Sequence, residues 1–167
     1  MKEKPQERQR TRFIAVGSGK DDDEFKELTK SLGIEDVIVH FPLMKQSNLA
    51  HIYTVIEVFV FPTTRKGESL GLVGLEAMAC QTPIMASAIG GILDYVQDGH
   101  NGWLFTPGDA VQLKDLFIKF DELSTEQYAS ISQAAYTTAL QYEQTAIQSK
   151  LSAIFKELNL INKERGL

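Results

Sequence analysis

Two glutamates flank the start of a predicted helix, Glu68 in the loop before it and Glu76 about a turn and a half inside it. The helix is predicted to begin near Leu70, because Leu, Val, Glu, Ala and Met dominate the residues that follow and all favour helix. Helical side chains lean toward the N-terminus, so the carboxylate of Glu76 reaches back toward Glu68. The two carboxylates are therefore expected on either side of one helix N-terminus.

That N-terminus is a natural seat for a phosphate group, since it carries unpaired N–H groups and the positive end of the helix dipole. We expect the backbone N–H groups of Leu70, Gly71 and Leu72 to form the seat, with Ser69 beside them. Gly71 would also let a ligand approach the backbone closely. Carboxylates that faced phosphate would repel it, whereas flanking carboxylates can each accept hydrogen bonds from a vicinal diol. A molecule with a diol on either side of a phosphate group is a nucleotide sugar.

Three sequence blocks, in order, support that interpretation. The pattern Glu68-x7-Glu76 lies within ESLGLVGLEAMAC and is similar to the E-x7-E signature of the retaining GT-B glycosyltransferases, often called group 1 or family 4. The segments 86–92 and 98–109 resemble the next two blocks of the same family. The resemblance extends more loosely from residue 13 to about residue 158.

The resemblance implies roles for individual residues. Glu76 would hold the ribose hydroxyls of the donor nucleotide, and Glu68, the candidate catalytic residue, would contact hydroxyls of the donor sugar. In this family no metal and no covalent protein nucleophile are needed, because the leaving diphosphate oxygen is thought to help deprotonate the acceptor on the same face. The protein would then contribute positioning and electrostatic stabilisation of the departing diphosphate.

Four further residues are possible phosphate or cleft contacts. The family supplies a basic pair for the diphosphate, largely from a first strand and loop that have no counterpart here. Arg65 and Lys66 lie close enough in sequence to substitute for that pair, or they form a solvated loop. Gly90 and Gly91 could place N–H groups at the cleft, or they could be the tight turn that a strand-to-helix junction needs.

No residue pattern predicts a metal site or a reactive thiol. His40, His51 and His100 are far apart and have no ligand-like spacing. Cys80 is the single cysteine, which excludes an internal disulfide and fits a reducing compartment. We expect no cofactor, with a nucleotide-diphosphate sugar as the substrate.

Composition excludes other classes of protein. With 167 residues, 43% of them hydrophobic and 23% charged, the chain has the size and make-up of one globular domain. A formal net charge of -5 argues against a nucleic-acid binder, which would show a basic face. No apolar run approaches the roughly 18 residues of a membrane span, and no signal peptide is visible after Met1. The expected location is the cytoplasm.

Strand-like segments that alternate with helical ones predict an α/β, Rossmann-like fold, a parallel sheet with helices on both faces. Five strands are expected at about residues 12–16, 36–40, 57–61, 83–87 and 102–105. Helix caps are expected where the chain offers the right side chains: Asp21–Asp23 and Gly33 around one helix, Ser47 before a second, and Ser124 with Gln127 before a later one. A last helix carries an apolar stripe that is either core or a domain-contact surface: Ile147, Leu151, Ile154, Phe155 and Leu158.

Three segments are predicted: a polar leader at 1–11, a partial GT-B C-terminal nucleotide-sugar-binding domain at 12–160, and a tail at 161–167. Measured against GT-B donor domains, the strand ending at Val16 matches the second strand, and the first has no counterpart. The strands near Val16 and Val58 should flank the missing one. Because unpaired strand edges are costly, they should close up against each other or borrow a strand from another chain.

The first functional hypothesis is the donor-binding part of a hexosyl-type glycosyltransferase, which transfers a sugar with retention to a saccharide or lipid-linked acceptor in polysaccharide biosynthesis. The isolated chain is not expected to turn over without an N-terminal acceptor domain, supplied in cis or in trans. The alternative is a non-catalytic fragment or subunit of a split enzyme that binds nucleotide sugar or a partner chain. A nucleotide-sugar epimerase of the same fold is a weaker alternative, because those enzymes lack the E-x7-E context. The donor sugar, the base and the acceptor stay open.

Overall fold

A computed structural model describes the backbone of residues 11–164 and the side chains of residues 11–156. The chain divides into two compact units, Met1–Leu49 and Ala50–Leu167, and each is described by itself. Of the predicted leader, 1–11, all but Thr11 lies outside the described residues, and the predicted tail lies outside them from residue 165 onward.

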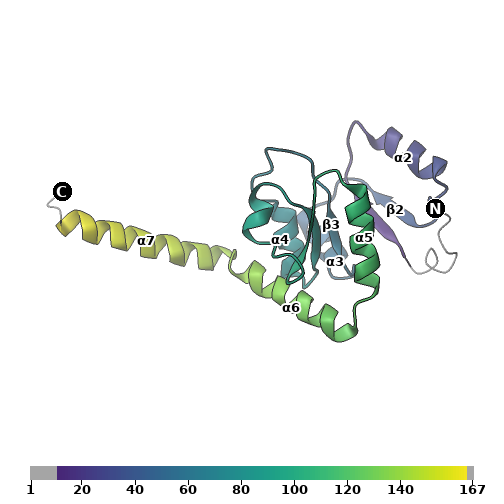
Figure 1. The fold of residues 1–167 in the computed structure, drawn as a ribbon. Coiled ribbons are helices and arrows are strands. Elements are labelled where there is room, and N and C mark those ends of the chain that lie inside the picture. The colour runs from purple at the N-terminus through teal and green to yellow at the C-terminus, as the bar shows by residue number, and fades with distance from the viewer. Residues whose placement is uncertain (1–10, 165–167) are drawn as a thin grey trace. The chain divides into compact units, whose positions relative to one another are not determined.

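The first unit contains one pair of parallel strands, and the chain forms a helix in the segment that connects them (Figure 1). β1 (Phe13–Val16) pairs in parallel with β2 (Ile38–Phe41), and Phe13 lies opposite Ile38. α2 (Asp22–Ser31) begins with three acidic residues in its first turn, and Gly33 follows it at φ +62, as the sequence predicts. Four apolar side chains of this sheet remain exposed: Phe13, Ile14, Val39 and Phe41.

The second unit contains a three-stranded parallel sheet in the order β3-β4-β5. Its strands are β3 (Phe59–Phe61), β4 (Ile84–Ser87) and β5 (Gly102–Phe105). The elements that precede and connect them are α3 (Gln46–Tyr53), whose residues from Ala50 onward belong to this unit, α4 (Leu72–Ala79) and the 3-10 turn η1 (Gly90–Asp94). Three helices follow the sheet: α5 (Ala110–Asp121), α6 (Thr125–Leu140) and α7 (Gln144–Glu164).

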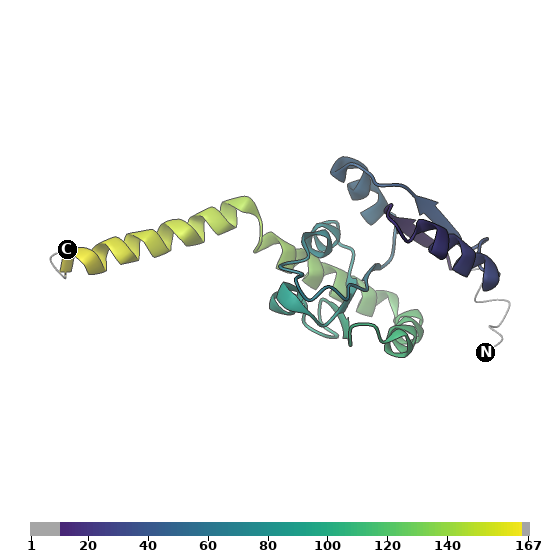
Figure 2. The same cartoon turned by 90° about the horizontal axis from the view of Figure 1, so that it is seen from above.

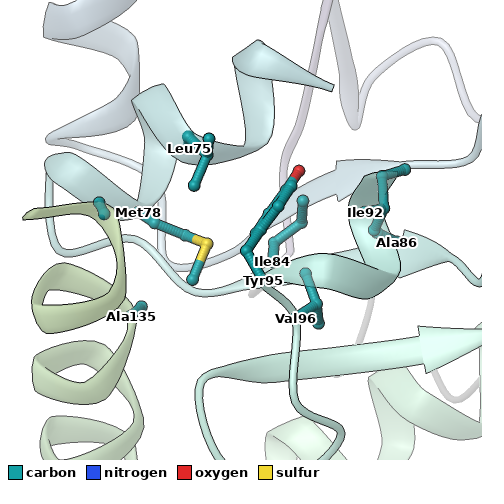
Figure 3. Packing of buried hydrophobic residues seen from close by; sticks show 9 residues of the cluster. Leu75, Met78, Ile84, Ala86, Ile92, Tyr95, Val96 and Ala135 are labelled. Carbon is teal, nitrogen blue, oxygen red and sulfur yellow. The ribbon is translucent and has the colours of Figure 1, made fainter. Parts of the chain in front are cut away.

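Successive residues of β4 face two different hydrophobic clusters, as the period of two in a strand requires. Ile84 and Ala86 pack with side chains of α4, η1 and α6, which Figure 3 shows at close range. Met85 packs with Trp103 and Phe105 of β5 and with the apolar side of α5. The prediction of helices on both faces of a parallel sheet is therefore confirmed for this unit.

The positions of the five strands are confirmed to within two residues, but the expectation of a single sheet is wrong. β1 pairs with β2 and β3 pairs with β4, and within the described part of the chain no ladder joins β1 to β3. The expected pairing of these two strands is therefore absent from the described residues. The described residues contain no strand that would lie between β1 and β3 and pair with both. The borrowing of a strand from another chain stays a prediction.

One prediction about the helices is corrected, one is confirmed, and one helix of the structure was not predicted. Ser47 lies inside α3, which begins at Gln46, and therefore does not cap it. The capping box of Ser124 and Gln127 is present at the start of α6. α5 was not predicted; Asp109 caps it by accepting hydrogen bonds from two backbone N–H groups.

α7 follows α6 after a short turn and is a single long helix (Figure 2). Its apolar stripe is exposed at Ile147, Leu151, Ile154 and Phe155, so those side chains are not part of the core of this chain, while the side chain of Leu158 lies outside the described residues. Among the helices of residues 11–164, none combines the length and the apolar character that crossing a bilayer demands.

Candidate functional site

The candidate site lies where two neighbouring parallel strands end. The loop that carries Glu68 follows β3, and Gly90 opens the turn that follows β4. In parallel α/β sheets, ligands bind at the carboxyl ends of the strands. The structure thus places the first two of the three sequence blocks, the one that contains Glu68 and the segment 86–92, on the edge of the sheet where a ligand is expected.

α4 begins at Leu72, two residues later than the sequence predicts, because Gly71 adopts the left-handed conformation at φ +67 and precedes the helix as its N-cap. This conformation favours glycine. A side chain at Gly71 would also crowd Ile92 and Phe61, each 3.1 Å from the position of a Cβ atom. Local geometry therefore requires this glycine, whether or not a ligand approaches it.

Gly90 and Gly91 pack directly against the backbone of the Glu68 loop. A Cβ atom on Gly90 would overlap the carbonyl oxygen of Glu68, and one on Gly91 would overlap the carbonyl oxygen of Ser69. The N–H of Gly91 donates a hydrogen bond to that Ser69 oxygen at 2.8 Å. The glycine pair thus joins the two loops of the site through their main chains.

Tyr95, directly after η1, ties the same loop to the core. Its side chain is 2% exposed, and its hydroxyl donates a hydrogen bond of 3.0 Å to the carbonyl oxygen of Gly71. Gly74 makes room for that hydroxyl, because a Cβ atom there would overlap it. Figure 3 shows the ring of Tyr95 standing within the core cluster, with its oxygen toward α4. Burial raises the pKa of Tyr95, and the carboxylate of Glu68 adds to the effect, so this phenol is a hydrogen-bond donor at neutral pH.

The backbone donors predicted to hold phosphate are uncommitted. Among the residues that the structure describes, the N–H groups of Leu70, Gly71 and Leu72 donate to no other group of the chain. Within the described residues the N–H groups of Ser69 and Val73 likewise donate to no other group. The run ends at Glu68, whose N–H donates to the Arg65 carbonyl, and at Gly74, whose N–H donates to the Gly71 carbonyl. The free donors therefore form one short run at the start of α4.

The two glutamates lie beside different tyrosines. Glu68 is half-buried and its charge reaches Tyr95, as described above. Glu76 is half-buried on α4 and its charge reaches Tyr53 of α3: burial raises the pKa of Tyr53 to about 12, with Glu76 as the next cause. Burial and then Glu76 also raise the pKa of the Cys80 thiol, which makes that thiol less reactive. Glu76 therefore lies within electrostatic reach of Tyr53 and Cys80.

The possible cationic contacts, Arg65 and Lys66, are exposed in the loop before Glu68. The backbone N–H of Arg65 donates to the hydroxyl of Thr63 at 3.2 Å. The salt bridges found among residues 11–156 include neither Arg65 nor Lys66. In the same part of the chain no group of three His, Cys, Asp or Glu side chains could hold a metal ion.

Sequence reasoning missed Tyr95 and Asn101 as parts of the site. Asn101 is fully buried, and its side-chain amide donates to the backbone oxygen of Tyr95 at 2.8 Å and to the hydroxyl of Thr138 at 2.9 Å. Its side-chain oxygen accepts from the N–H of Gln97 at 2.7 Å. Asn101 lies in the third sequence block, which marks its segment, but no sequence signal singles out Tyr95.

The chain is similar to known proteins in sequence and in fold. A family model described as "Glycosyl transferases group 1" matches residues 1–138. A D-inositol 3-phosphate glycosyltransferase of Arthrobacter sp. (strain FB24) is 32% identical over 135 residues, which are 80% of this chain and 32% of that protein. The chain spans about a third or less of the length of the curated relatives that it matches first.

Two solved structures share the fold. The crystal structure of Anabaena HepE in complex with UDP-glucose is 25% identical with a TM-score of 0.75, over 86% of this chain and 40% of that one. The C-terminal domain of LpcC, a glycosyl transferase group 1 family protein from Francisella tularensis, is 25% identical with a TM-score of 0.65. That match covers 78% of this chain and 70% of the LpcC domain.

Proposed function

The chain belongs to the group 1 glycosyl transferases, and we propose that the segment from Glu68 to Glu76 binds a nucleotide-diphosphate sugar. In this proposal the diphosphate sits on the N–H groups of Leu70, Gly71 and Leu72, with Ser69 at its side. The single observation that carries the proposal is this run of uncommitted donors at the start of α4. HepE, whose fold this chain shares, was crystallised with UDP-glucose, so that compound is the probe of choice.

The two glutamates take the two ends of this ligand. Glu76, on α4, would accept hydrogen bonds from the ribose hydroxyls. Glu68, in the loop beyond the phosphate seat, would accept them from the sugar hydroxyls and is the proposed catalytic contact. Hydrogen bonds to carboxylates are about twice as strong as neutral ones, which suits the recognition of diols.

The chemistry proposed is sugar transfer with retention to a saccharide or lipid-linked acceptor. This chain would position the donor and stabilise the departing diphosphate by backbone N–H groups, without a metal ion. Two carboxylates near a diphosphate oppose that stabilisation, so cations are needed. Arg65 and Lys66 are exposed and free to turn toward the phosphates, and Gly90 stays a possible backbone contact.

Residues 12–160 would be the donor-binding domain of a larger enzyme, whose N-terminal acceptor domain is supplied in cis or in trans. The likeness to a solved C-terminal domain of a group 1 family protein supports this assignment. We further place the enzyme in polysaccharide biosynthesis in the cytoplasm. The free thiol of Cys80 fits that location, because the cytoplasm keeps cysteines reduced.

Isothermal titration of the 167-residue chain with UDP-glucose tests the site. Glu76→Gln should weaken binding about 10- to 100-fold, which corresponds to the loss of one charge-assisted hydrogen bond. Glu122→Gln, an exposed substitution just after α5, is the matched control and should bind like the unaltered chain. The proposal would be contradicted if the unaltered chain did not bind UDP-glucose, or if Glu76→Gln and Glu122→Gln bound it equally well. A large gain in affinity on adding Mg²⁺ would also contradict it.

A further inference from the structure

The geometry points to a clamp that orients the phosphate seat: Gly91 and Tyr95 hold two carbonyl groups of the Glu68–Leu72 loop inward, and thereby turn the N–H groups of Leu70 and Leu72 outward. Gly91 and Tyr95 are then positioning residues for phosphate rather than groups that touch it. This inference rests on the proposed function, because it explains how the seat of that function is oriented.

The first arm of the clamp is Gly91. Its N–H donates to the carbonyl oxygen of Ser69 at 2.8 Å. In a trans peptide unit the C=O of one residue and the N–H of the next point in opposite directions within one plane. With the Ser69 carbonyl directed at Gly91, the N–H of Leu70 is directed away from it. A side chain at Gly91 would overlap the Ser69 oxygen, so only glycine allows this approach.

The second arm is Tyr95. Its hydroxyl donates to the carbonyl oxygen of Gly71 at 3.0 Å, and the N–H of Gly74 donates to the same oxygen at 2.8 Å. The same peptide geometry directs the N–H of Leu72 to the opposite side, away from the core. The Leu72 side chain is 63% exposed, which agrees with this outward direction of its residue.

Tyr95 can serve as a fixed point because its own position is held from several sides. Its ring lies in the core cluster and packs edge-on against Tyr142, with ring centroids 6.0 Å apart. Its backbone oxygen accepts from the amide of Asn101 at 2.8 Å. Donors that are oriented before the ligand arrives need no reorganisation on binding, and this raises affinity without adding a contact.

Tyr95→Phe tests the second arm, because it removes the hydroxyl and keeps the ring. Tyr128→Phe is the matched control: the Tyr128 hydroxyl also donates to a loop carbonyl, that of Glu57, at 3.1 Å. Both variants lose one tyrosine-to-carbonyl hydrogen bond, so a purely structural role predicts the same outcome for both. The readouts are the affinity for UDP and the ¹⁵N–¹H shifts of the Leu70 and Leu72 amides during a UDP titration of the full chain.

In the unaltered chain, UDP should shift both amides. Tyr95→Phe should weaken UDP binding about 5- to 10-fold, the value of one ordinary hydrogen bond, and reduce the Leu72 shift while the Leu70 shift is kept. Gly91→Ala should do the reverse, reducing the Leu70 shift and sparing Leu72. Tyr128→Phe should bind UDP within about twofold of the unaltered chain, because the Tyr128 hydroxyl contacts Glu57 and not the Glu68–Leu72 loop, and substitutions that share no partners act independently.

Three outcomes would overturn the clamp. The first is a Tyr95→Phe variant that binds UDP as tightly as the unaltered chain and shows the same Leu72 shift. The others are a Tyr128→Phe variant that weakens UDP binding as much as Tyr95→Phe does, or the loss of both amide shifts in Tyr95→Phe and also in Gly91→Ala. Failure of the proposed function is seen separately, in the unaltered chain: UDP would then shift neither amide, whatever the variants do.

Discussion

The two sheets of this protein contain strands of similar apolar composition but very different burial. In β1 and β2, Phe13, Ile14, Val39 and Phe41 are 37–44% exposed, whereas every residue of β4 is buried. Both hydrophobic clusters described above draw all their members from the second unit. Two strands and one helix bury little surface, and a third strand with helices on both sides is needed for a closed core.

The candidate site belongs to the better-buried sheet, and that association has a physical reason. Backbone donors and carboxylates recognise a ligand only when their supports are fixed, and here the supports are buried residues such as Tyr95 and Asn101. The exposed apolar residues of β1 and β2 offer no such support within their own unit. Stability measurements on matched residues of the two units can therefore test the comparison.

The largest difference is expected for isoleucine truncation. Ile84→Ala, at a fully buried position of β4, should lower the free energy of unfolding by about 3–5 kcal/mol, because it removes a side chain and leaves a cavity. Ile14→Ala in β1, where the side chain is 37% exposed, should lower it by about 1 kcal/mol or less. Urea unfolding followed by circular dichroism measures both values. Equal losses would show that the two sheets do not differ in packing.

A smaller difference is expected for the addition of a methyl group to glycine. A Cβ atom on Gly102 would lie 2.6 Å from the Ile84 carbonyl oxygen, while one on Gly19 of the first unit meets nothing within 4 Å. Gly102→Ala should therefore cost about 1–3 kcal/mol of unfolding free energy, as overpacking does. Gly19→Ala should be close to neutral. Thermal unfolding of the two variants distinguishes them, and a stable Gly102→Ala protein would contradict the close approach of β4 and β5.

The smallest effect is a coupling within the second unit. Gly74→Ala should be destabilising because its Cβ overlaps the Tyr95 hydroxyl, and Tyr95→Phe removes that hydroxyl. The double variant should therefore be more stable than the sum of the single variants predicts, by about 1 kcal/mol. A double-mutant cycle by chemical denaturation gives the value. Strict additivity would mean that the hydroxyl and Gly74 do not share this space.

The five strands and the order of the motifs could be predicted from the sequence, because apolar runs such as Ile84–Ser87 are bounded by turn residues. The division into two sheets could not, since strand pairing depends on which strands the fold brings together. α5 was missed although the sequence contains its signal, since Leu113, Leu116, Phe117 and Phe120 recur at helical spacing after the capping residue Asp109.

The site was predicted as a stretch of residues but not as an arrangement. The spacing of Glu68 and Glu76 marks the segment, and the free N–H groups of Leu70 to Leu72 follow from a helix start in any fold. The contact of Gly91 with Ser69 and of Tyr95 with Gly71 depends on tertiary packing between residues about 20 positions apart, which local sequence does not encode. Their roles in binding stay predictions.

The measurement that tests the central claim most directly compares UDP with UDP-glucose as ligands for Glu68→Ala and Glu76→Ala. Glu76→Ala should weaken both ligands by similar factors, because both carry the ribose. Glu68→Ala should weaken UDP-glucose and spare UDP, because only the conjugate carries the sugar. Each loss should be about one to two decades in affinity, for charge-assisted hydrogen bonds of about 1.5–3 kcal/mol. If the folded variants both bind UDP-glucose as tightly as the unaltered chain, the two glutamates do not form a nucleotide-sugar site.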